Sequence, residues 1–324
     1  MIRNQWYAVI ESREVEHKPI GVIRMGEKLV FWRDQTNKVH CFVDKCVHRG
    51  AELSKGKLKD NKIQCPFHGL EYDVSGRVVL IPANGKATPV PNHFQIPKYV
   101  THEGQNFIWI WWGSQPPEKL EPPGFFSDIH EELSYYSIKT RWTTHYSRVI
   151  ENQLDLAHLP FVHHNTIGRG GRTIVDGPRI EWISDHEFHV HVHNRKDDGR
   201  RPLKAEELPI PDPASDVKLE FMFPNLWQLY ISPKMRVLAA FVPIDMENTL
   251  MYLRFYQSIV RAPVFRDIFN RMFMLYNRIV VNQDKRVVRT QEPKVTGLRI
   301  DEMLFQADRP ITEYRRRRQD LQGK

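Results

Sequence analysis

Short apolar runs separated by turn residues fill the first third of the chain and predict a small all-β domain. Between Trp6 and Trp112, runs such as Leu29–Trp32 and Val78–Ile81 alternate with Gly, Asp and Asn, which is the spacing of short strands. Four prolines follow between residues 113 and 124, and such a stretch favours a linker between domains. The pattern therefore predicts a first domain at 1–115, a Pro-rich linker at 116–126 and a second domain at 127–324.

The second domain has longer apolar runs joined by short turns, which predict a meandering antiparallel sheet. Apolar residues at Ile268, Met272, Leu275 and Ile279 repeat with a helical period, and Pro293 ends this long helix. The fold class we expect is α+β, with the small all-β domain followed by a helix-grip, START-like domain whose antiparallel sheet wraps around the long C-terminal helix. The predicted strands are 135–142, 179–183, 187–193, 217–223, 226–231, 237–242 and 249–257, and the predicted helices are 143–159 and 264–291.

Composition and charge are those of an ordinary globular protein. Of the 324 residues, 41% are hydrophobic and 27% are charged, and no run of eighteen apolar residues indicates a membrane span. The first residues lack the apolar stretch of a signal peptide, so we expect a cytoplasmic, reducing location. The net charge is +8, but basic residues are scattered among acidic ones, which ranks nucleic acid last as a partner. We interpret the run Arg315–Arg318 as a solvated tail, with docking of an acidic electron donor as the alternative.

Two Cys and two His stand in two short glycine-flanked loops of the first domain. Cys46 precedes His48 by two residues, and Cys65 precedes His68 by three. A [2Fe-2S] cluster with two Cys on one iron and two His on the other requires this ligand set, because imidazole raises its reduction potential. A structural zinc site is the alternative, although zinc sites mostly pair Cys with Cys and His with His. The remaining Cys41 is expected to be buried in a strand.

At these loops the sequence resembles the Rieske cluster domain of ring-hydroxylating oxygenases and related ferredoxins. The resemblance supports Cys46, His48, Cys65 and His68 as the cluster ligands. Val47 and Leu70 stand where that family often has Pro and Trp, and neither position is a ligand.

A second group of metal-ligating residues follows at the predicted helix 143–159. Asp155 and His158 are separated by three residues and share a helix face. Pro160 disrupts the helix and allows His163 to approach His158. Two His and one carboxylate, with one face of the metal open, form the site of non-haem Fe(II) that activates O2. The candidate for the distant carboxylate is Asp284 on the long C-terminal helix.

A chain with both sites resembles the catalytic α-subunit of the Rieske non-haem iron oxygenases. The resemblance implies that His158, His163 and Asp284 bind the iron, with His164 as the alternative to His163. It also implies that Asp155 bridges the iron site to the cluster of a neighbouring subunit in a ring-shaped homotrimer, and it places Asn152 in the same catalytic motif.

Two further patterns concern the sheet. His189, His191 and His193 alternate along one predicted strand, which we interpret as a polar sheet face. The substrate cavity is expected to be lined by residues from a set of seven aromatic side chains and closed by the loop 168–171. The seven are Phe221, Phe223, Trp227, Tyr230, Phe241, Tyr252 and Phe255.

These observations predict a terminal oxygenase that uses O2 to hydroxylate or oxidatively demethylate a small organic substrate, with an aromatic substrate expected. Electrons are expected from a separate reductase or ferredoxin, because no GxGxxG fingerprint opens a βαβ unit here. Chains of this length resemble the monooxygenase and demethylase branch of the family. The alternative function is a Rieske electron-transfer protein whose C-terminal domain binds a ligand without catalysis.

Overall fold

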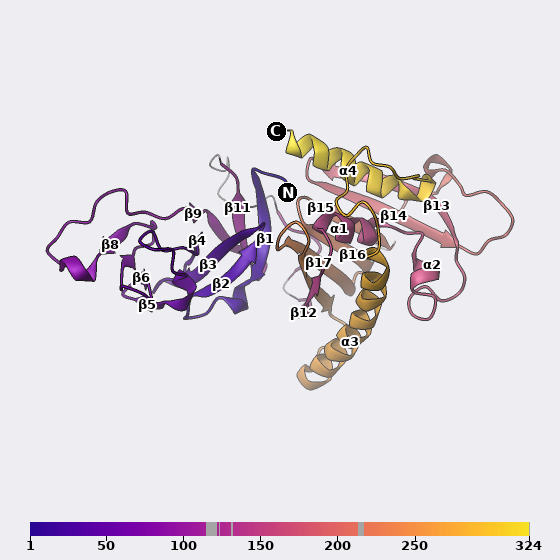
Figure 1. Cartoon of the computed structure of the whole chain (residues 1–324). Helices are drawn as coiled ribbons and strands as arrows, with labels where there is room; N and C mark the ends of the chain where they lie inside the picture. The colour runs from indigo at the N-terminus through magenta and orange to yellow at the C-terminus, as the bar shows by residue number, and fades with distance from the viewer. Residues whose placement is uncertain (115–121, 123, 131, 213–216, 324) are drawn as a thin grey trace. The chain divides into compact units, whose positions relative to one another are not determined.

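The computed structural model describes the chain except for residues 115–121, 123, 131, 213–216 and 324. The chain divides into two compact units, Arg3–Gly124 and Phe125–Lys324, the second of which also includes Met1–Ile2 (Figure 1). The predicted linker at 116–126 lies largely outside the described residues. Among the described helices, none combines the length and hydropathy that a bilayer crossing requires.

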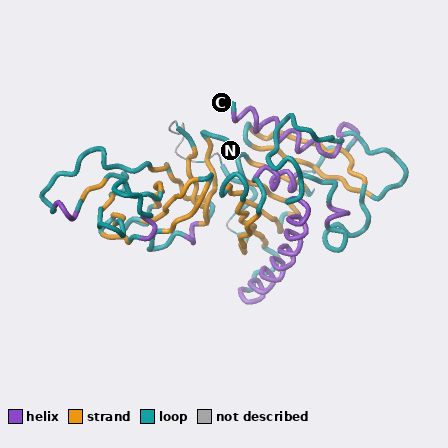
Figure 2. Tube along the Cα trace, in the orientation of Figure 1, coloured by secondary structure: helices purple, strands orange, loops and turns teal. Residues whose placement is uncertain are grey.

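The N-terminal unit is built from three small antiparallel sheets, with strands and loops making up most of it (Figure 2). The first sheet has the order β1-β11-β10, with β1 at Gln5–Glu11, β11 at Phe107–Trp112 and β10 at Thr101–Gly104. The second has the order β2-β3-β4-β9, at Ile20–Arg24, Glu27–Arg33, Val39–Val43 and Lys98–Tyr99. The third has the order β5-β6-β7-β8, at Lys57–Lys59, Lys62–Gln64, Glu71–Tyr72 and Val78–Leu80.

A hydrophobic cluster joins the second and third of these sheets and supports both Cys/His loops. It contains Trp32, Phe42 and Ile63 together with the two loop cysteines, Cys46 and Cys65. The Cys46 loop follows β4, and the Cys65 loop connects β6 to β7. Because the cysteines are part of a packed core, the loops are held on a rigid base.

The C-terminal unit contains one seven-stranded antiparallel sheet with the order β12-β18-β17-β16-β15-β14-β13. All of its neighbouring strands except the edge pair β12 and β18 follow each other in sequence, which confirms the predicted meander. The strands are β12 at Ser134–Trp142, β13 at Ile174–Ser184, β14 at Glu187–Arg195, β15 at Lys218–Met222, β16 at Leu226–Ser232, β17 at Met235–Pro243 and β18 at Thr249–Gln257.

The described residues of this unit form four α-helices: α1 at Tyr146–Leu154, α2 at Leu159–Val162, α3 at Pro263–Val288 and α4 at Arg309–Gln322. Short 3-10 turns occur in the N-terminal unit at Ser12–Glu14, Leu53–Lys55 and Pro82–Asn84, and in the C-terminal unit at Ala205–Glu207 and Gln306–Asp308. One face of the sheet packs with residues of α1, α3 and α4 in a single hydrophobic core. The α+β class is confirmed, but α1 and α4 share this face of the sheet with α3, whereas the prediction placed only the long helix there and did not include α4.

Strand alternation divides the seven aromatic residues predicted to line the cavity. Phe221, Phe223, Trp227, Phe241 and Phe255 belong to the core between sheet and helices. The sequence left open which of the seven point inward. Residues alternate between the faces of a strand, and Tyr230 and Tyr252 lie on the opposite face, where Tyr230 lies beside the cations of Lys218 and Arg236.

The interpretation of Arg315–Arg318 as a solvated tail is wrong for two of its four residues. Arg315 and Arg318 are buried on α4, where only 3% and 6% of their surfaces remain exposed. Arg315 donates hydrogen bonds to both carboxylate oxygens of Glu151 on α1, at 2.9 and 2.7 Å. Arg318 Nη1 donates to Thr296 Oγ1 at 3.0 Å, and the run of four arginines in the sequence did not reveal either contact.

Candidate functional site

The two Cys/His loops of the N-terminal unit have the same backbone geometry. In each loop the Cys N–H donates to the carbonyl five residues later at 2.8 Å, and the Gly four residues later donates back to the Cys carbonyl at 2.9 or 3.2 Å. These glycines, Gly50 and Gly69, have φ values of 73° and 74°, a region that other residues rarely adopt. The glycines noted in the sequence therefore close both loops.

The four candidate cluster ligands converge from these loops. The Nδ1 atoms of His48 and His68 lie 3.1 Å apart, and both imidazoles are at the exposed end of the loops. Cys46 and Cys65 are buried at their base. A pair of buried thiols and a pair of exposed imidazoles whose nitrogens face each other fits a cluster with Cys ligands inside and His ligands outside.

Tyr72 on β7 supports this site and was not predicted from the sequence. Its hydroxyl donates to Cys46 Sγ at 3.1 Å and accepts from the Val47 N–H at 3.0 Å. Burial, together with the Cys46 thiol, raises the pKa of Tyr72, so its hydroxyl remains protonated and able to donate. Hydrogen bonds to cluster sulfurs tune the reduction potential.

The second site begins where α1 ends. Asp155 caps α1 and accepts hydrogen bonds from the N–H groups of Ala157 at 2.7 Å and His158 at 3.2 Å. The predicted continuous helix 143–159 is therefore wrong, because this side chain turns the backbone before His158. Pro160 does not break a helix but occupies the first turn of α2, where its missing N–H is not needed.

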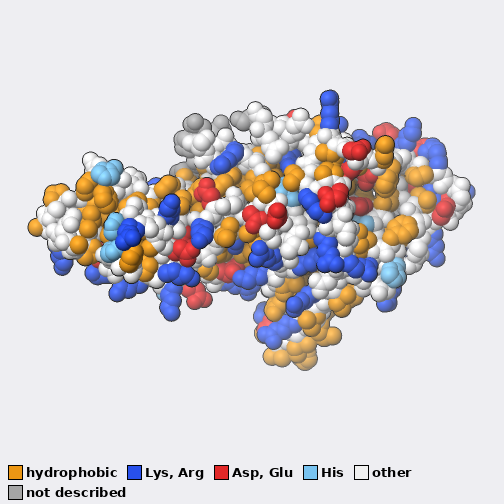
Figure 3. All heavy atoms as spheres, viewed as in Figure 1, with side chains coloured by type: hydrophobic (Ala, Val, Ile, Leu, Met, Phe, Trp, Pro, Cys, Tyr) orange, Lys and Arg blue, Asp and Glu red, His pale blue; other side chains and the backbone are white. Residues whose placement is uncertain are grey.

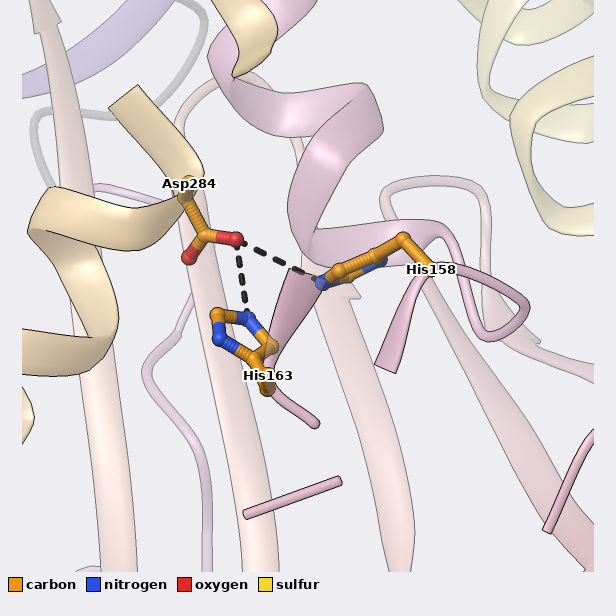
Figure 4. Close-up of side chains that lie close together, drawn as sticks. All are labelled: His158, His163 and Asp284. Atoms are coloured by element: carbon orange, nitrogen blue, oxygen red, sulfur yellow. Dashed lines mark ion pairs between the residues drawn. The ribbon is translucent and has the colours of Figure 1, made fainter. Parts of the chain in front are cut away.

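His158, His163 and Asp284 come together from α2 and α3 (Figure 4). Asp284 Oδ1 lies 2.9 Å from His163 Nε2 and 3.5 Å from His158 Nε2. One potential ligand atom from each residue lies within 4.8 Å of the others. Two imidazole nitrogens and one carboxylate oxygen around one point are the donors of a mononuclear non-haem iron site.

The carboxylate of this group also fits a cation. Asp284 is buried, and its Oδ1 atom has no hydrogen-bond partner among the described residues although it faces two imidazoles. An unsatisfied buried carboxylate oxygen is costly, and a bound cation would satisfy it. Burial alone would lower the pKa of His163, but Asp284 raises it on balance, which reflects the negative potential at this point.

Gln283 fixes the orientation of His163. Its Oε1 atom accepts from His163 Nδ1 at 2.9 Å and from Thr166 Oγ1 at 2.8 Å, while its Nε2 donates to Asn165 Oδ1 at 2.7 Å. Since Nδ1 carries the proton in this bond, Nε2 is left free to coordinate a metal. The sequence placed Gln283 beside Asp284 but did not predict this bond.

Asp155 also lies beside the second imidazole. Its Oδ2 atom is 3.7 Å from His158 Nδ1. Burial would raise the pKa of Asp155, but His158 and the two backbone N–H groups lower it on balance, so the carboxylate is ionised. Asn152 lies one turn earlier on α1, and its Nδ2 atom is buried with no partner among the described residues.

Other histidines lie outside this group. His164, the alternative ligand, is exposed, and its Nδ1 donates to the Phe161 carbonyl at 3.1 Å. On β14, His189 Nε2 lies 2.9 Å from Glu187 and His191 Nε2 lies 3.7 Å from Glu181. Acidic partners therefore accompany this polar sheet face.

Comparison with known proteins assigns both parts of the chain. Residues 5–99 match the Rieske [2Fe-2S] domain, and residues 142–322 match the vanillate O-demethylase oxygenase C-terminal domain. Aminopyrrolnitrin oxygenase of Pseudomonas fluorescens is 34% identical over 163 residues, which cover 49% of this chain and 45% of that protein. The vanillate O-demethylase oxygenase subunit of a Pseudomonas species is 32% identical over 171 residues, which cover 52% of this chain and 46% of the relative. Each match therefore spans less than half of the relative.

Solved structures share the fold over the whole chain. A mutant of NdmA from Pseudomonas putida CBB5 with theobromine has a TM-score of 0.80 at 22% identity, covering 99% of this chain and 91% of the other. Dicamba monooxygenase bound to dicamba has a TM-score of 0.75 at 18% identity, covering 100% and 98%. At these identities the likeness establishes the fold.

Proposed function

Since this chain belongs to the Rieske oxygenase family that shares the vanillate O-demethylase oxygenase C-terminal domain, we propose that it is a terminal oxygenase. It uses O2 and electrons from a separate reductase or ferredoxin to hydroxylate or oxidatively demethylate a small aromatic substrate. The observation that carries this proposal is the group formed by His158, His163 and Asp284, whose ligand atoms lie within 4.8 Å of one another around a buried carboxylate oxygen.

The roles of individual residues follow from their contacts. When bound, the [2Fe-2S] cluster stores an electron and the mononuclear Fe(II) activates O2. Cys46, His48, Cys65 and His68 hold the cluster. His158, His163 and Asp284 would hold the iron.

The surrounding residues orient these ligands. Gln283 keeps the His163 Nδ1 proton on the side away from the metal, so that Nε2 is a lone-pair donor. Asp155 stays ionised near His158 Nδ1 and fixes that ring through its charge. Asn152, with a free buried amide, is the candidate for a further polar contact on the same side.

The substrate class is inferred from the relatives. The names of the relatives refer to vanillate, aminopyrrolnitrin and dicamba. Hydroxylation and demethylation begin with the same oxidation at carbon, so either outcome is consistent with this site.

Partners and assembly remain predictions from the sequence. A separate electron donor is expected because one relative is named as the oxygenase subunit of vanillate O-demethylase, a name that implies a further subunit. The homotrimer, with Asp155 facing the cluster of a neighbouring subunit, is implied by family resemblance. The cytoplasmic location is likewise a prediction.

The alternative, an electron carrier with a non-catalytic C-terminal domain, is not favoured. A domain that only binds a ligand does not require two imidazoles and a buried carboxylate oxygen that converge on one point. Counting iron and acid-labile sulfide separates the two functions. The oxygenase is expected to contain three irons per two sulfides, and the carrier two per two.

The decisive variant is His158→Ala, with His164→Ala as the control from the same segment. His158→Ala should lower the iron content from three to two per two sulfides, retain the visible spectrum of the cluster and abolish substrate-dependent O2 consumption. His164→Ala should keep three irons and full turnover, because His164 is exposed and outside the group. Retained turnover in His158→Ala would refute the assignment.

A further inference from the structure

The exposed side of α3 carries an apolar stripe with the spacing of a coiled-coil seam. Phe265, Ile268, Met272, Leu275 and Ile279 follow each other at alternating intervals of three and four residues. Between 51% and 70% of the surface of each is exposed. Alternating steps of three and four are the a and d positions of a heptad, along which helices pack together.

This stripe is not the side by which α3 packs on its own domain. The buried positions of α3 are Asn270, Met274, Val281, Asp284 and Val288, on the opposite side of the helix. Their intervals of three, four and seven residues place them on one face, which is directed at the sheet. The stripe is therefore additional to the face that folding requires.

The figures agree with this division. Figure 1 shows the N-terminal half of α3 extending past the edge of the sheet. Figure 3 shows hydrophobic side chains gathered over this end of the helix, with Lys and Arg side chains beside them. An exposed, contiguous apolar surface with charged neighbours is typical of a protein–protein interface.

We propose that this stripe packs against the same stripe on α3 of another copy of this chain. The five side chains leave roughly 500 Å² of apolar surface exposed, which is within the range of functional patches. Two such stripes in contact would bury about 1,000 Å², the lower limit for a specific interface. The contact is separate from the one between Asp155 and a neighbouring cluster, because it joins identical surfaces.

Charges along the stripe select a parallel arrangement of the two helices. Arg271 and Arg278 occupy the g positions, and Phe269 and Tyr276 occupy the e positions. In parallel helices g faces e of the partner, so Arg271 meets an aromatic ring, which attracts a cation. In antiparallel helices g faces g, which would place arginine against arginine.

The same helix carries a candidate iron ligand. The heptad pattern ends at Ile279, because the next d position is the polar, exposed Asn282, and Asp284 lies directly beyond it. Assembly through the stripe would therefore hold the helix that supplies Asp284. This inference stands independently of the proposed reaction, since it depends only on the exposed side of α3.

The first test compares Met272→Arg with Met246→Arg by light scattering on the cofactor-loaded protein. Both residues are exposed, with 66% and 54% of their surfaces accessible, but Met246 lies in the turn between β17 and β18. Met272→Arg should halve the particle mass of the wild type, leaving the assembly that lacks the α3 contact, because it brings two unpaired charges into an apolar seam. Met246→Arg should assemble like the wild type. Equal assembly of both variants, or a monomeric wild type, would overturn the proposal.

A cysteine variant tests the symmetry of the contact. In a parallel seam, identical d positions face each other within the reach of a disulfide. Leu275→Cys should therefore form a covalent dimer under mild oxidation, whereas Met246→Cys should not. A head-to-tail contact would leave both variants uncrosslinked and would refute the shared seam, while iron content and turnover would still report on the proposed function.

Discussion

Removing Arg315 from its buried network should destabilise the C-terminal unit strongly. Arg315 donates to Glu151 Oε1 and Oε2 at 2.9 and 2.7 Å and to Glu302 Oε2 at 2.6 Å. Arg148 Nη2 lies 2.6 Å from Glu302 Oε1, and its Nη1 lies 3.5 Å from Glu151 Oε2. In Arg315→Met, two carboxylates therefore share one arginine.

The size of this effect follows from burial. Glu151 is 4% exposed and Arg315 is 3% exposed, and leaving a buried charge without its partner costs about 3–5 kcal/mol. For a unit of this length, that loss lowers the melting temperature by roughly 6–20 °C. Scanning calorimetry of the cofactor-loaded protein measures the shift.

A second variant separates the charge from the packing. Glu151→Leu combined with Arg315→Met leaves Arg148 paired with Glu302, so the network is again neutral. The double variant should therefore recover at least half of the stability that Arg315→Met loses. If the stability lost in the double variant equals the sum of the losses in Glu151→Leu and Arg315→Met alone, pairing between Arg315 and Glu151 is not what stabilises the contact between α1 and α4.

Three further changes test the site and its support. Gly168→Ala should lower iron occupancy and expose α2 to proteolysis, because a Cβ atom there would lie 1.9 Å from the Leu159 carbonyl oxygen. Gln283→Leu should weaken iron binding about 10–100-fold in a chelator competition, since His163 loses the bond that holds its ring. His145→Asn should reduce acid destabilisation, because burial and a nearby arginine lower the pKa of His145 from 6.5 to about 3. The stability gained from its neutral form is complete above pH 6.5 and is lost by about 1.4 kcal/mol per pH unit as the pH falls towards 3.

Matched controls make these results interpretable. Gly297→Ala should be neutral, because the nearest atom to its added Cβ lies at 3.6 Å. Asn282→Leu should keep its iron, because Asn282 is exposed beside Gln283 on α3. For His145, the difference between wild type and variant in urea unfolding at pH 7 and pH 5 isolates the effect. If the difference in unfolding free energy between wild type and variant is the same at pH 7 and pH 5, this histidine takes up a proton in the folded protein as readily as in the unfolded one.

Local patterns determined the cluster loops and the order of the strands. The Cys46 and Cys65 loops are short and close on their own glycines, so the spacing of ligands in the sequence already defines their geometry. Alternating apolar residues likewise identified the seven strands of the large sheet to within five residues at each end, because strand formation follows the local pattern. The α+β class followed from the strands, and the family resemblance rested on the cluster loops together with His158, His163 and Asp284.

Tertiary contacts decided the rest. The break of the helix at Asp155 depends on a side-chain hydrogen bond, and the burial of Arg315 depends on Glu151, which lies 164 positions earlier. The orientation of Tyr230 depends on strand register, because a register shift of one residue would turn its side chain to the other face of the sheet. Asp284 could be selected from the sequence as a candidate, but only the packing of α3 on the sheet brings its carboxylate within 2.9 Å of His163. Periodicity describes the faces of an element, whereas the partner of each face is fixed by residues distant in the chain.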